Sequence, residues 1–198
     1  MQPNDGKIEL YNQLIEGCRN NNRDAQYKLY QVLSGKMFAV CLRYSKNREV
    51  AEDLVQEGFV KVFNNIDKYR GEGSFEGWVR RIFVNTAVEH YRKNSKMYPV
   101  VDVEQVSTEV EWVNPGDELQ LADLMNLINQ LSPGYRTIFN MYVIEGYSHK
   151  EISEMLEISE GTSKSQLARA RYLLMDMIKK AELVRKTNDL TNILGEKQ

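Results

Sequence analysis

The chain has 198 residues, of which 42% are hydrophobic and 27% charged, and its 26 Lys and Arg against 28 Asp and Glu give a net charge of −2. This composition is too apolar and too balanced for a disordered chain, and the length suits one ordinary domain or two small ones. No stretch approaches the roughly 20 apolar residues of a membrane span and the start lacks a signal-peptide core, so we expect a cytoplasmic protein without membrane insertion.

Apolar residues at helical spacing predict two helices, over residues 8–18 and 24–44. Cys18 and Cys41 belong to this apolar pattern, so we interpret them as core thiols rather than as a disulfide or a metal pair. The only two histidines of the sequence, His90 and His149, lie far apart and have no ligand-like neighbours. We therefore expect no metal and no other cofactor.

The stretch "NREVAEDLVQEGFVKVFNNI" predicts a third helix. One face carries a core stripe that includes Leu54, at 100° per residue. Carboxylates on the opposite face are often merely solvated, but an outward Val60 among polar and acidic groups favours a surface that docks on a protein. No nucleophile, metal-ligand set or phosphate loop accompanies these acids, which argues against an enzyme. The outward face consists of Asp53, Gln56, Glu57, Val60 and Asn64.

A fourth helix is predicted after the loop at residues 70–74, where Ser74 can cap it. Its core face includes Phe75, Trp78, Val79, Ile82 and Thr86. Cations, an amide and an aromatic on the other side are the side chains that hold phosphates and stack on exposed bases, although a merely solvated face stays an alternative. This second stripe contains Arg81, Asn85, Val88 and Arg92, with Arg80, Tyr91 and Lys93 beside it.

Residues 97–117 form the predicted linker. Between Met97 and Asp123 the chain carries seven acids and no Lys or Arg, together with two prolines and a glycine, and "VVDVEQVSTEVEW" shows no helical period. Removing seven negative charges from a chain of net charge −2 leaves +5, so the flanking modules lean basic. The segment is either a solubilising tether or a strap that occupies a basic channel on a partner.

The second helical module is predicted over residues 118–183. "ELQLADLMNLINQL" is amphipathic, a Ser-Pro pair at 132–133 begins the next helix, and Gly146 ends it. Ser148 with Glu151 three residues later forms a capping box for a further helix. The tail, residues 184–198, has mixed charge and predicts nothing.

The stretch from Ser148 to Arg171 predicts two short helices joined by a tight turn, which is typical of a helix–turn–helix. The N-terminus of its second helix and Lys164 are suited to phosphates, and Gln166 and Arg169 to base edges. Other short helical hairpins share these caps, so a hairpin that does not bind DNA stays an alternative. The residues assigned to DNA are Thr162, Ser163, Lys164, Ser165, Gln166, Arg169 and Arg171.

Three motifs together resemble the extracytoplasmic-function sigma factors, the small alternative sigma subunits of bacterial RNA polymerase. "AEDLVQEGFVKVF" is similar to the family's core-binding helix, "GSFEGWVRRIFVNTAVEHYRK" to the helix that melts and reads the −10 element, and the stretch from "LSPGYRTIF" to "RARYLL" to the domain that reads the −35 element. The resemblance runs from about Leu14 to about Lys180. It departs from the family at Ser163, where many members have an apolar residue, and at Gln166, where many have a basic one.

The resemblance implies an all-α protein of two small helical domains: residues 1–96 for core binding and the −10 element, and residues 118–183 for the −35 element. The acidic strap would thread toward the polymerase's active-site and RNA-exit channel, and an anti-sigma factor is a further implied partner. The implied contacts with the clamp helices of the largest polymerase subunit are Asp53, Leu54, Gln56, Glu57 and Val60. The implied contacts with promoter DNA are Arg80, Arg81, Arg92 and Lys93 for the −10 backbone, and Asn85 with the 70–75 loop for a flipped base.

The sequence is also compatible with two other functions. The helix–turn–helix could belong to a conventional regulator that binds an operator by itself, or the whole chain could be a helical adaptor that binds only proteins. A sigma factor differs from both because it should need core polymerase to act at a promoter.

Overall fold

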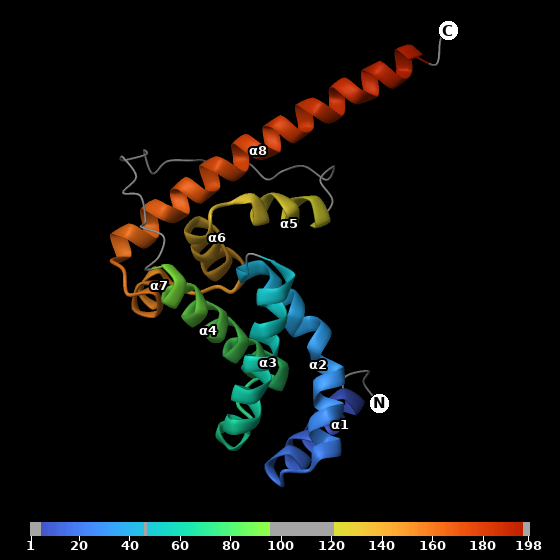
Figure 1. The fold of residues 1–198 in the computed structure, drawn as a ribbon, viewed down its shortest axis with the longest axis vertical. Coiled ribbons are helices and arrows are strands. Elements are labelled where there is room, and N and C mark those ends of the chain that lie inside the picture. Colours follow the sequence, from blue (N-terminus) through green and yellow to red (C-terminus); the bar gives the residue numbers. More distant parts are fainter. Residues whose placement is uncertain (1–4, 46, 96–120, 196–198) are drawn as a thin grey trace. The chain divides into compact units, whose positions relative to one another are not determined.

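The computed structural model describes residues 5–45, 47–95 and 121–195, and all regular structure within these ranges is helical (Figure 1). The all-α prediction is confirmed. The chain divides into two compact units with the boundary after Tyr98. The predicted acidic linker, residues 97–117, lies outside the described residues.

The first unit is a bundle of four helices around α2. It contains α1 (Asp5–Arg19), α2 (Arg23–Tyr44), α3 (Arg48–Asn65), a short 3₁₀ turn (Ile66–Lys68) and α4 (Phe75–Ser95). Helix α2 packs against α1, α3 and α4, and α4 also packs against α3 (Figure 1). The helices predicted over residues 8–18 and 24–44 are thus confirmed.

Side-chain caps explain where the helices of this unit begin. The Asn22 side chain accepts hydrogen bonds from the backbone N–H groups of Asp24 and Ala25 at the start of α2. Ser74 Oγ accepts one from the Gly77 N–H, at 3.0 Å, which confirms the predicted cap of α4. Each cap satisfies backbone donors that a helix leaves without intrahelical partners in its first turn.

The core of the first unit forms where the apolar stripes of α2, α3 and α4 meet, at fully buried side chains such as Leu33, Val62 and Phe83. Cys18 and Cys41 are buried free thiols, in agreement with their interpretation as core residues. Gly58 allows α3 and α4 to approach, because a Cβ built there would lie 2.5 Å from a ring carbon of Phe83.

We expect Gly58→Ala to destabilise the first unit. The added methyl must displace the buried Phe83 ring, and overpacking of this kind costs about 1–3 kcal/mol, which exceeds the roughly 1 kcal/mol that alanine gains over glycine in a helix. Gly35→Ala in α2 is the matched control, since a Cβ placed at Gly35 would have nothing within 4 Å apart from its own helix's backbone and chain neighbours, and it should be neutral or stabilising. Urea unfolding of both variants measures the difference; equal stabilisation of both would contradict close packing at Gly58.

The second unit contains α5 (Leu121–Gln130), α6 (Pro133–Phe139), a π-helical turn (Asn140–Ile144), α7 (His149–Leu156) and α8 (Glu160–Gly195). The predicted capping box at the start of α7 is confirmed, with both reciprocal hydrogen bonds present. The predicted helix after Ser132 begins at Pro133 as expected, but its last turn is π-helical before the positive-φ Gly146.

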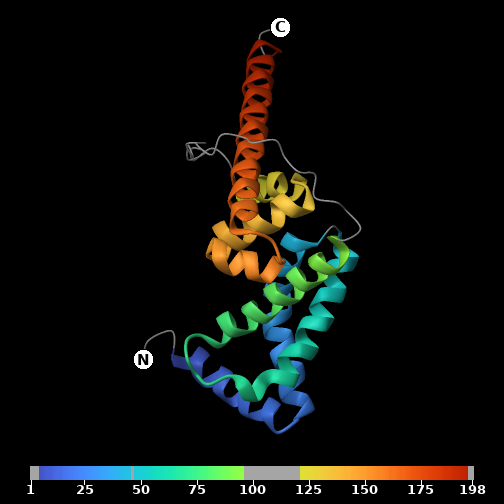
Figure 2. The same cartoon turned by 90° about the vertical axis from the view of Figure 1, so that its left-hand side faces the viewer.

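Helices α7 and α8 are joined by a sharp turn in which Glu157 adopts a left-handed conformation, with φ at 57°. Ser159 Oγ then accepts a hydrogen bond from the Thr162 N–H at 2.9 Å, which caps α8. Helix α8 is 36 residues long and continues to Gly195, well past the other helices of its unit (Figure 2). The residues predicted as a tail therefore include the last turns of this helix.

Candidate functional site

The outward face of α3 is exposed as predicted. Asp53, Gln56 and Glu57 are exposed polar residues, and Val60 is an apolar side chain with 58% of its surface exposed. Leu54 is only 2% exposed and packs in the core. Its placement among the contact residues is therefore corrected: Leu54 supports this face from beneath and cannot touch a partner unless the bundle opens.

Helix α4 presents a mixed polar face. Arg81, Asn85 and Lys93 are exposed and Arg80 and Arg92 are half-buried. Val88, which the pattern placed on this face, is 2% exposed and belongs to the core. The core side of α4 is wider than predicted because α4 packs against both α2 and α3.

A cavity of about 340 Å³ opens between α3 and α4. Asn85 lies on its wall, where an amide can bond to the polar edge of a base, and Trp78 adds an aromatic surface. The helical spacing predicts Trp78 as a core residue, and it does not indicate that Lys61 lies at this cavity. The cavity is lined by Lys61, Asn65, Lys68, Trp78, Ile82, Asn85, Thr86 and Glu89.

The loop at residues 70–75 lines a different cavity, of about 740 Å³, which Asn85 does not reach. In the free protein Asn85 and this loop line different cavities, and Asn85 shares its cavity with residues at the end of α3. That Asn85 and the loop together hold one flipped base stays a prediction. The loop is shaped by two positive-φ glycines, Gly71 and Gly73, and its Gly73 carbonyl accepts a hydrogen bond from the Tyr69 hydroxyl at 2.9 Å.

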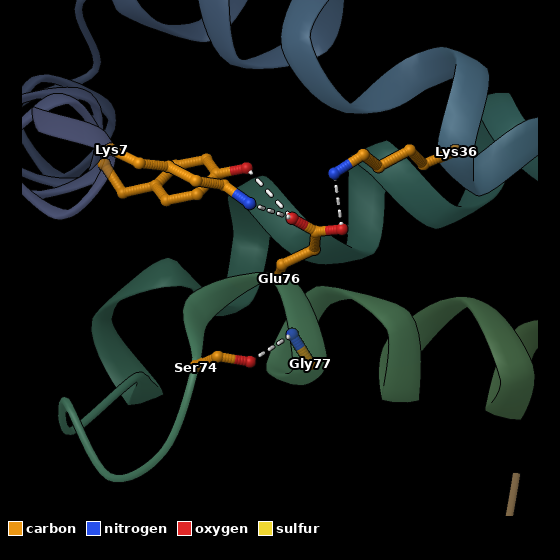
Figure 3. A network of polar contacts seen from close by, with 6 residues as sticks. Lys7, Lys36, Ser74, Glu76 and Gly77 are labelled. Atoms are coloured by element: carbon orange, nitrogen blue, oxygen red, sulfur yellow. Dashed lines mark hydrogen bonds and ion pairs between the residues drawn. The ribbon is translucent and has the colours of Figure 1, made fainter. Parts of the chain in front are cut away.

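Glu76, in the first turn of α4, ties α1 and α2 to the start of α4 (Figure 3). Its carboxylate accepts hydrogen bonds from Lys36 Nζ at 2.7 Å and Lys7 Nζ at 3.1 Å, and from the Tyr11 hydroxyl at 3.3 Å. Bonding to Lys36 and then Lys7 outweighs burial and lowers the pKa of Glu76. Burial, with the charge and hydrogen bond of Glu76, raises the pKa of Tyr11 to about 12.

We expect Glu76→Gln to destabilise the protein at pH 7 by no more than about 1 kcal/mol, because both ammonium groups are half exposed and water screens such pairs. Since the folded-state pKa of Glu76 lies below its unfolded value, this contribution is present above the unfolded pKa and is lost as pH falls through the folded one. Urea unfolding at pH 7 and at about pH 3 should show the difference from wild type shrink with acid. A difference that is unchanged at low pH would contradict a charge-based contribution.

The recognition surface of the second unit is narrower than predicted. Lys164 and Ser165 are exposed, with Lys164 3.7 Å from Glu160. Arg169 is half-buried, and its guanidinium lies 5.2 Å from the Tyr172 ring centroid. Thr162 and Arg171 are half-buried as well, with Arg171 close to the Tyr142 ring.

Two residues assigned to DNA contacts are buried. Gln166 is 7% exposed and Ser163 is 0% exposed, so both assignments are corrected. The Ser163 hydroxyl pairs with His149 Nδ1 at 2.9 Å, and this contact joins the first residue of α7 to the start of α8. The His149 ring also stacks on Tyr142, with centroids 4.5 Å apart. Burial, followed by the charges of Lys164 and Arg171, lowers the pKa of His149.

Neither a metal centre nor a membrane span emerges from the parts of the chain that the structure describes. Within those ranges, no three His, Cys, Asp or Glu side chains gather in a way that could ligate a metal ion. Of the helices in the same ranges, none combines the length and apolar character of a membrane-spanning segment. The candidate site is therefore made of surfaces: the α3 face, the α3–α4 cavity and the exposed side of α8.

Comparison with known families assigns both units. Residues 29–97 match the family described as "Sigma-70 region 2", and residues 121–174 match "Sigma-70, region 4". The first match covers α3, α4 and the cavity between them. The second contains α5 to α7 and the recognition part of α8.

Among curated proteins, the chain is similar to the ECF RNA polymerase sigma factor SigW of Bacillus subtilis, with 29% identity over 178 residues, 83% of this chain and 95% of that protein. The ECF RNA polymerase sigma-E factor of Haemophilus influenzae is 27% identical over 83% of this chain and 93% of its own. Among solved structures, the sigma factor RpoE in complex with the anti-sigma factor NepR from Bartonella quintana aligns at 23% identity with a TM-score of 0.47, over 77% of this chain and 96% of that one.

Proposed function

Since the chain belongs to the extracytoplasmic-function sigma factors of the sigma-70 family, with regions 2 and 4, we propose which partner each of its surfaces binds during transcription initiation. As a member of this family it directs promoter-specific transcription initiation and is not an enzyme. Three surfaces carry the proposal: the α3 face binds the polymerase, the α3–α4 cavity takes a base of the −10 element, and α8 holds the −35 element.

The α3 face docks on the clamp helices of the largest subunit of core RNA polymerase. Support comes from its composition: exposed Val60 is an apolar contact surrounded by the carboxylates of Asp53 and Glu57 and the amide of Gln56. An apolar centre with a polar rim is the usual anatomy of a protein interface. The acidic rim favours a partner surface that carries cations at the matching positions.

The cavity beside Asn85 is the single observation that carries the proposed role in promoter opening. A base that leaves the DNA stack needs an aromatic or apolar wall and a polar group for its edge. Trp78 and Ile82 supply the wall, and Asn85 supplies the amide. Arg80, Arg81, Arg92 and Lys93 hold the phosphates of the same strand, because they are the cations of α4.

The exposed side of α8 holds the −35 element. Lys164 and Ser165 are exposed in its first turns, where a recognition helix meets the major groove, and Thr162, Arg169 and Arg171 are half-buried beside them. Ser163 and Gln166 are buried inside the unit and support this surface rather than contact DNA. Base discrimination then falls chiefly to Arg169, a long, multiply donating side chain beside the exposed Tyr172 ring.

Lys164→Ala should weaken binding to cognate and scrambled duplex DNA equally and should lower the magnitude of the log–log salt slope by about 0.9, because one phosphate contact is lost. Lys180→Ala is the matched control, since Lys180 is an exposed cation of α8 paired with Asp176 beyond the recognition turns. Titrations of holoenzyme with promoter DNA across salt concentrations measure the slope. A loss confined to the cognate sequence would instead make Lys164 a base-reading residue.

The remaining partners follow from the family and are proposed on that ground. The acidic segment, residues 97–117, threads toward the polymerase's basic active-site and RNA-exit channel, where its charge imitates nucleic acid. An anti-sigma factor holds the chain inactive, and the protein acts in the cytoplasm, where polymerase and promoters are. The segment's charge supports the first of these, since it has no Lys or Arg.

The experiment that separates this function from a stand-alone regulator is promoter binding with and without core polymerase. The purified chain should bind duplex promoter DNA weakly by itself and tightly once core polymerase is added. Tight, sequence-specific binding by the free chain, unchanged by polymerase, would favour the regulator. An adaptor that binds only proteins would retain every function when Lys164 and Arg169 are both replaced by alanine.

A further inference from the structure

Lys61 connects the docking face of α3 with the cavity between α3 and α4. Its ammonium lies 2.9 Å from Glu57 Oε1, on the outward face of the same helix, and 2.8 Å from Glu89 Oε2 on α4. Lys61 and Glu89 also line the cavity that contains Asn85. One ammonium therefore bridges a residue proposed to bind the polymerase and a wall proposed to bind DNA.

The two carboxylates hold this charge closely. Hydrogen bonds to Glu89 and Glu57, with their charges, outweigh burial and raise the pKa of Lys61, so the side chain is a cation at every physiological pH. Its side chain is only 33% exposed, whereas the Glu57 and Glu89 side chains are each 46% exposed. A partner can therefore contact Glu57 directly. Nucleic acid, in contrast, would approach an ammonium whose single positive charge is already paired with two carboxylates.

We propose that Lys61 is a nucleic-acid-binding residue of this cavity. In the free protein its ammonium is paired with Glu57 and Glu89, and docking of Glu57 on the polymerase frees it to bind nucleic acid. The inference rests on the proposed function of both the α3 face and the cavity. It assigns Glu57 two tasks, as a contact with the polymerase and as a restraint on DNA binding before that contact is made.

The change in local charge gives the direction of the effect. Lys61 and Lys68 line the cavity with Glu89, and Glu57 adds a second carboxylate to the cluster, so the four side chains sum to zero. When a cation of the partner pairs with Glu57, the remaining three sum to +1. A phosphate or a base edge rich in acceptors is attracted only in the second state, which favours an unstacked base once the polymerase is bound.

Coupling of this kind is reciprocal. If occupation of Glu57 strengthens nucleic-acid binding in the cavity by some factor, nucleic acid in the cavity strengthens polymerase binding by the same factor. A bridge that served only to hold α3 against α4 would show no such coupling. Its loss would lower stability and leave the affinity for nucleic acid unchanged or weaker.

Glu57→Gln tests the inference in the full-length chain without polymerase, because it imitates neutralisation of Glu57. The probe is a short, fluorescently labelled, random-sequence single-stranded DNA at low salt, followed by anisotropy. We expect Glu57→Gln to bind it about fivefold more tightly than wild type, at the lower end of ordinary coupling between sites. Glu52→Gln is the matched control: it removes the same charge from α3, but from a pair with Arg48, at 2.7 Å. It should change the affinity less than twofold, roughly the effect of net charge alone.

A double-mutant cycle with Lys61→Met assigns the gain to this lysine. In the Lys61→Met background, Glu57→Gln should change binding no more than Glu52→Gln does. The inference is overturned if Glu57→Gln and Glu52→Gln act alike in the wild-type background, or if the gain persists without Lys61. The underlying function is tested separately by Asn85→Ala in the Glu57→Gln background of the same assay: an affinity equal to that of Glu57→Gln alone would remove the cavity from nucleic-acid binding altogether. Circular dichroism and urea unfolding confirm that each variant is folded.

Discussion

Replacing Asp53 and Glu57 together by arginine is expected to abolish binding to core RNA polymerase while the protein stays folded. Both side chains are exposed on the outward face of α3, so reversal of their charge leaves the core intact. Cations would then face cations of the partner, and like charges across an interface cost several kcal/mol. A loss of about 3 kcal/mol would weaken binding roughly a hundredfold.

The control for this prediction carries the same charge change on another helix. Glu9→Arg with Glu16→Arg places two reversals on exposed positions of α1 and should leave polymerase binding within about twofold of wild type, because screening weakens distant surface charges. Affinity is measured by titration of labelled protein with core polymerase. Equal losses in both double variants would show that net charge, and not the α3 face, governs the association; wild-type binding by the first would move the interface elsewhere.

Asn85→Ala is expected to impair promoter opening without weakening polymerase binding. The variant removes the exposed amide from the cavity wall, and nothing in the core depends on it. Loss of the contact with a flipped base should cost about 1–3 kcal/mol, which corresponds to a roughly 5- to 150-fold lower equilibrium constant for open-complex formation. The measurement is permanganate reactivity, or fluorescence of a base analogue in the −10 element, with saturating holoenzyme.

Asn94→Ala serves as the control, because Asn94 is also an exposed asparagine of α4 but bonds to His90 and does not line the cavity. A pre-melted template separates the steps further. If Asn85 promotes opening by holding the flipped base, a pre-melted template no longer needs that contribution and should rescue part of the defect. A defect in folding would persist on the pre-melted template. Full activity of Asn85→Ala on duplex promoters would remove this residue from the mechanism.

The sequence was most informative where local chemistry decides the outcome. Ser74, Ser148 and Ser159 act as caps because a hydroxyl beside a new helix satisfies backbone donors wherever the helix later packs. The outward placement of Asp53, Glu57 and Val60 follows because the residues that α3 buries against α2 and α4 all lie on one side of the helix, so periodicity suffices there.

Periodicity was less informative for helices that are buried over a wider part of their circumference. Val88 is buried because α4 meets both α2 and α3, and Gln166 is buried because α8 packs against α5, α6 and α7. A pattern that assumes one buried stripe assigns such residues to the wrong side. Ser163 did carry a signal: the family often has an apolar residue there, which indicates a buried position, and here His149 satisfies the hydroxyl.

The cavity and its lysine could not be predicted from spacing. Lys61 and Glu89 are 28 residues apart, and their contact depends on the angle at which α3 and α4 pack. Gly58 helps to set that approach, because its missing Cβ leaves room for the Phe83 ring. Contacts between helices of this kind follow from three-dimensional packing, so they appear only in the structure.

The most direct test of the account is in vitro transcription from fragmented genomic DNA with core polymerase, with and without the purified chain, and sequencing of the transcript starts. The account predicts a small set of start sites that appear only when the chain is present, share common −10 and −35 elements, and disappear with the Asp53→Arg/Glu57→Arg variant. Start sites identical to those of core polymerase alone would contradict it.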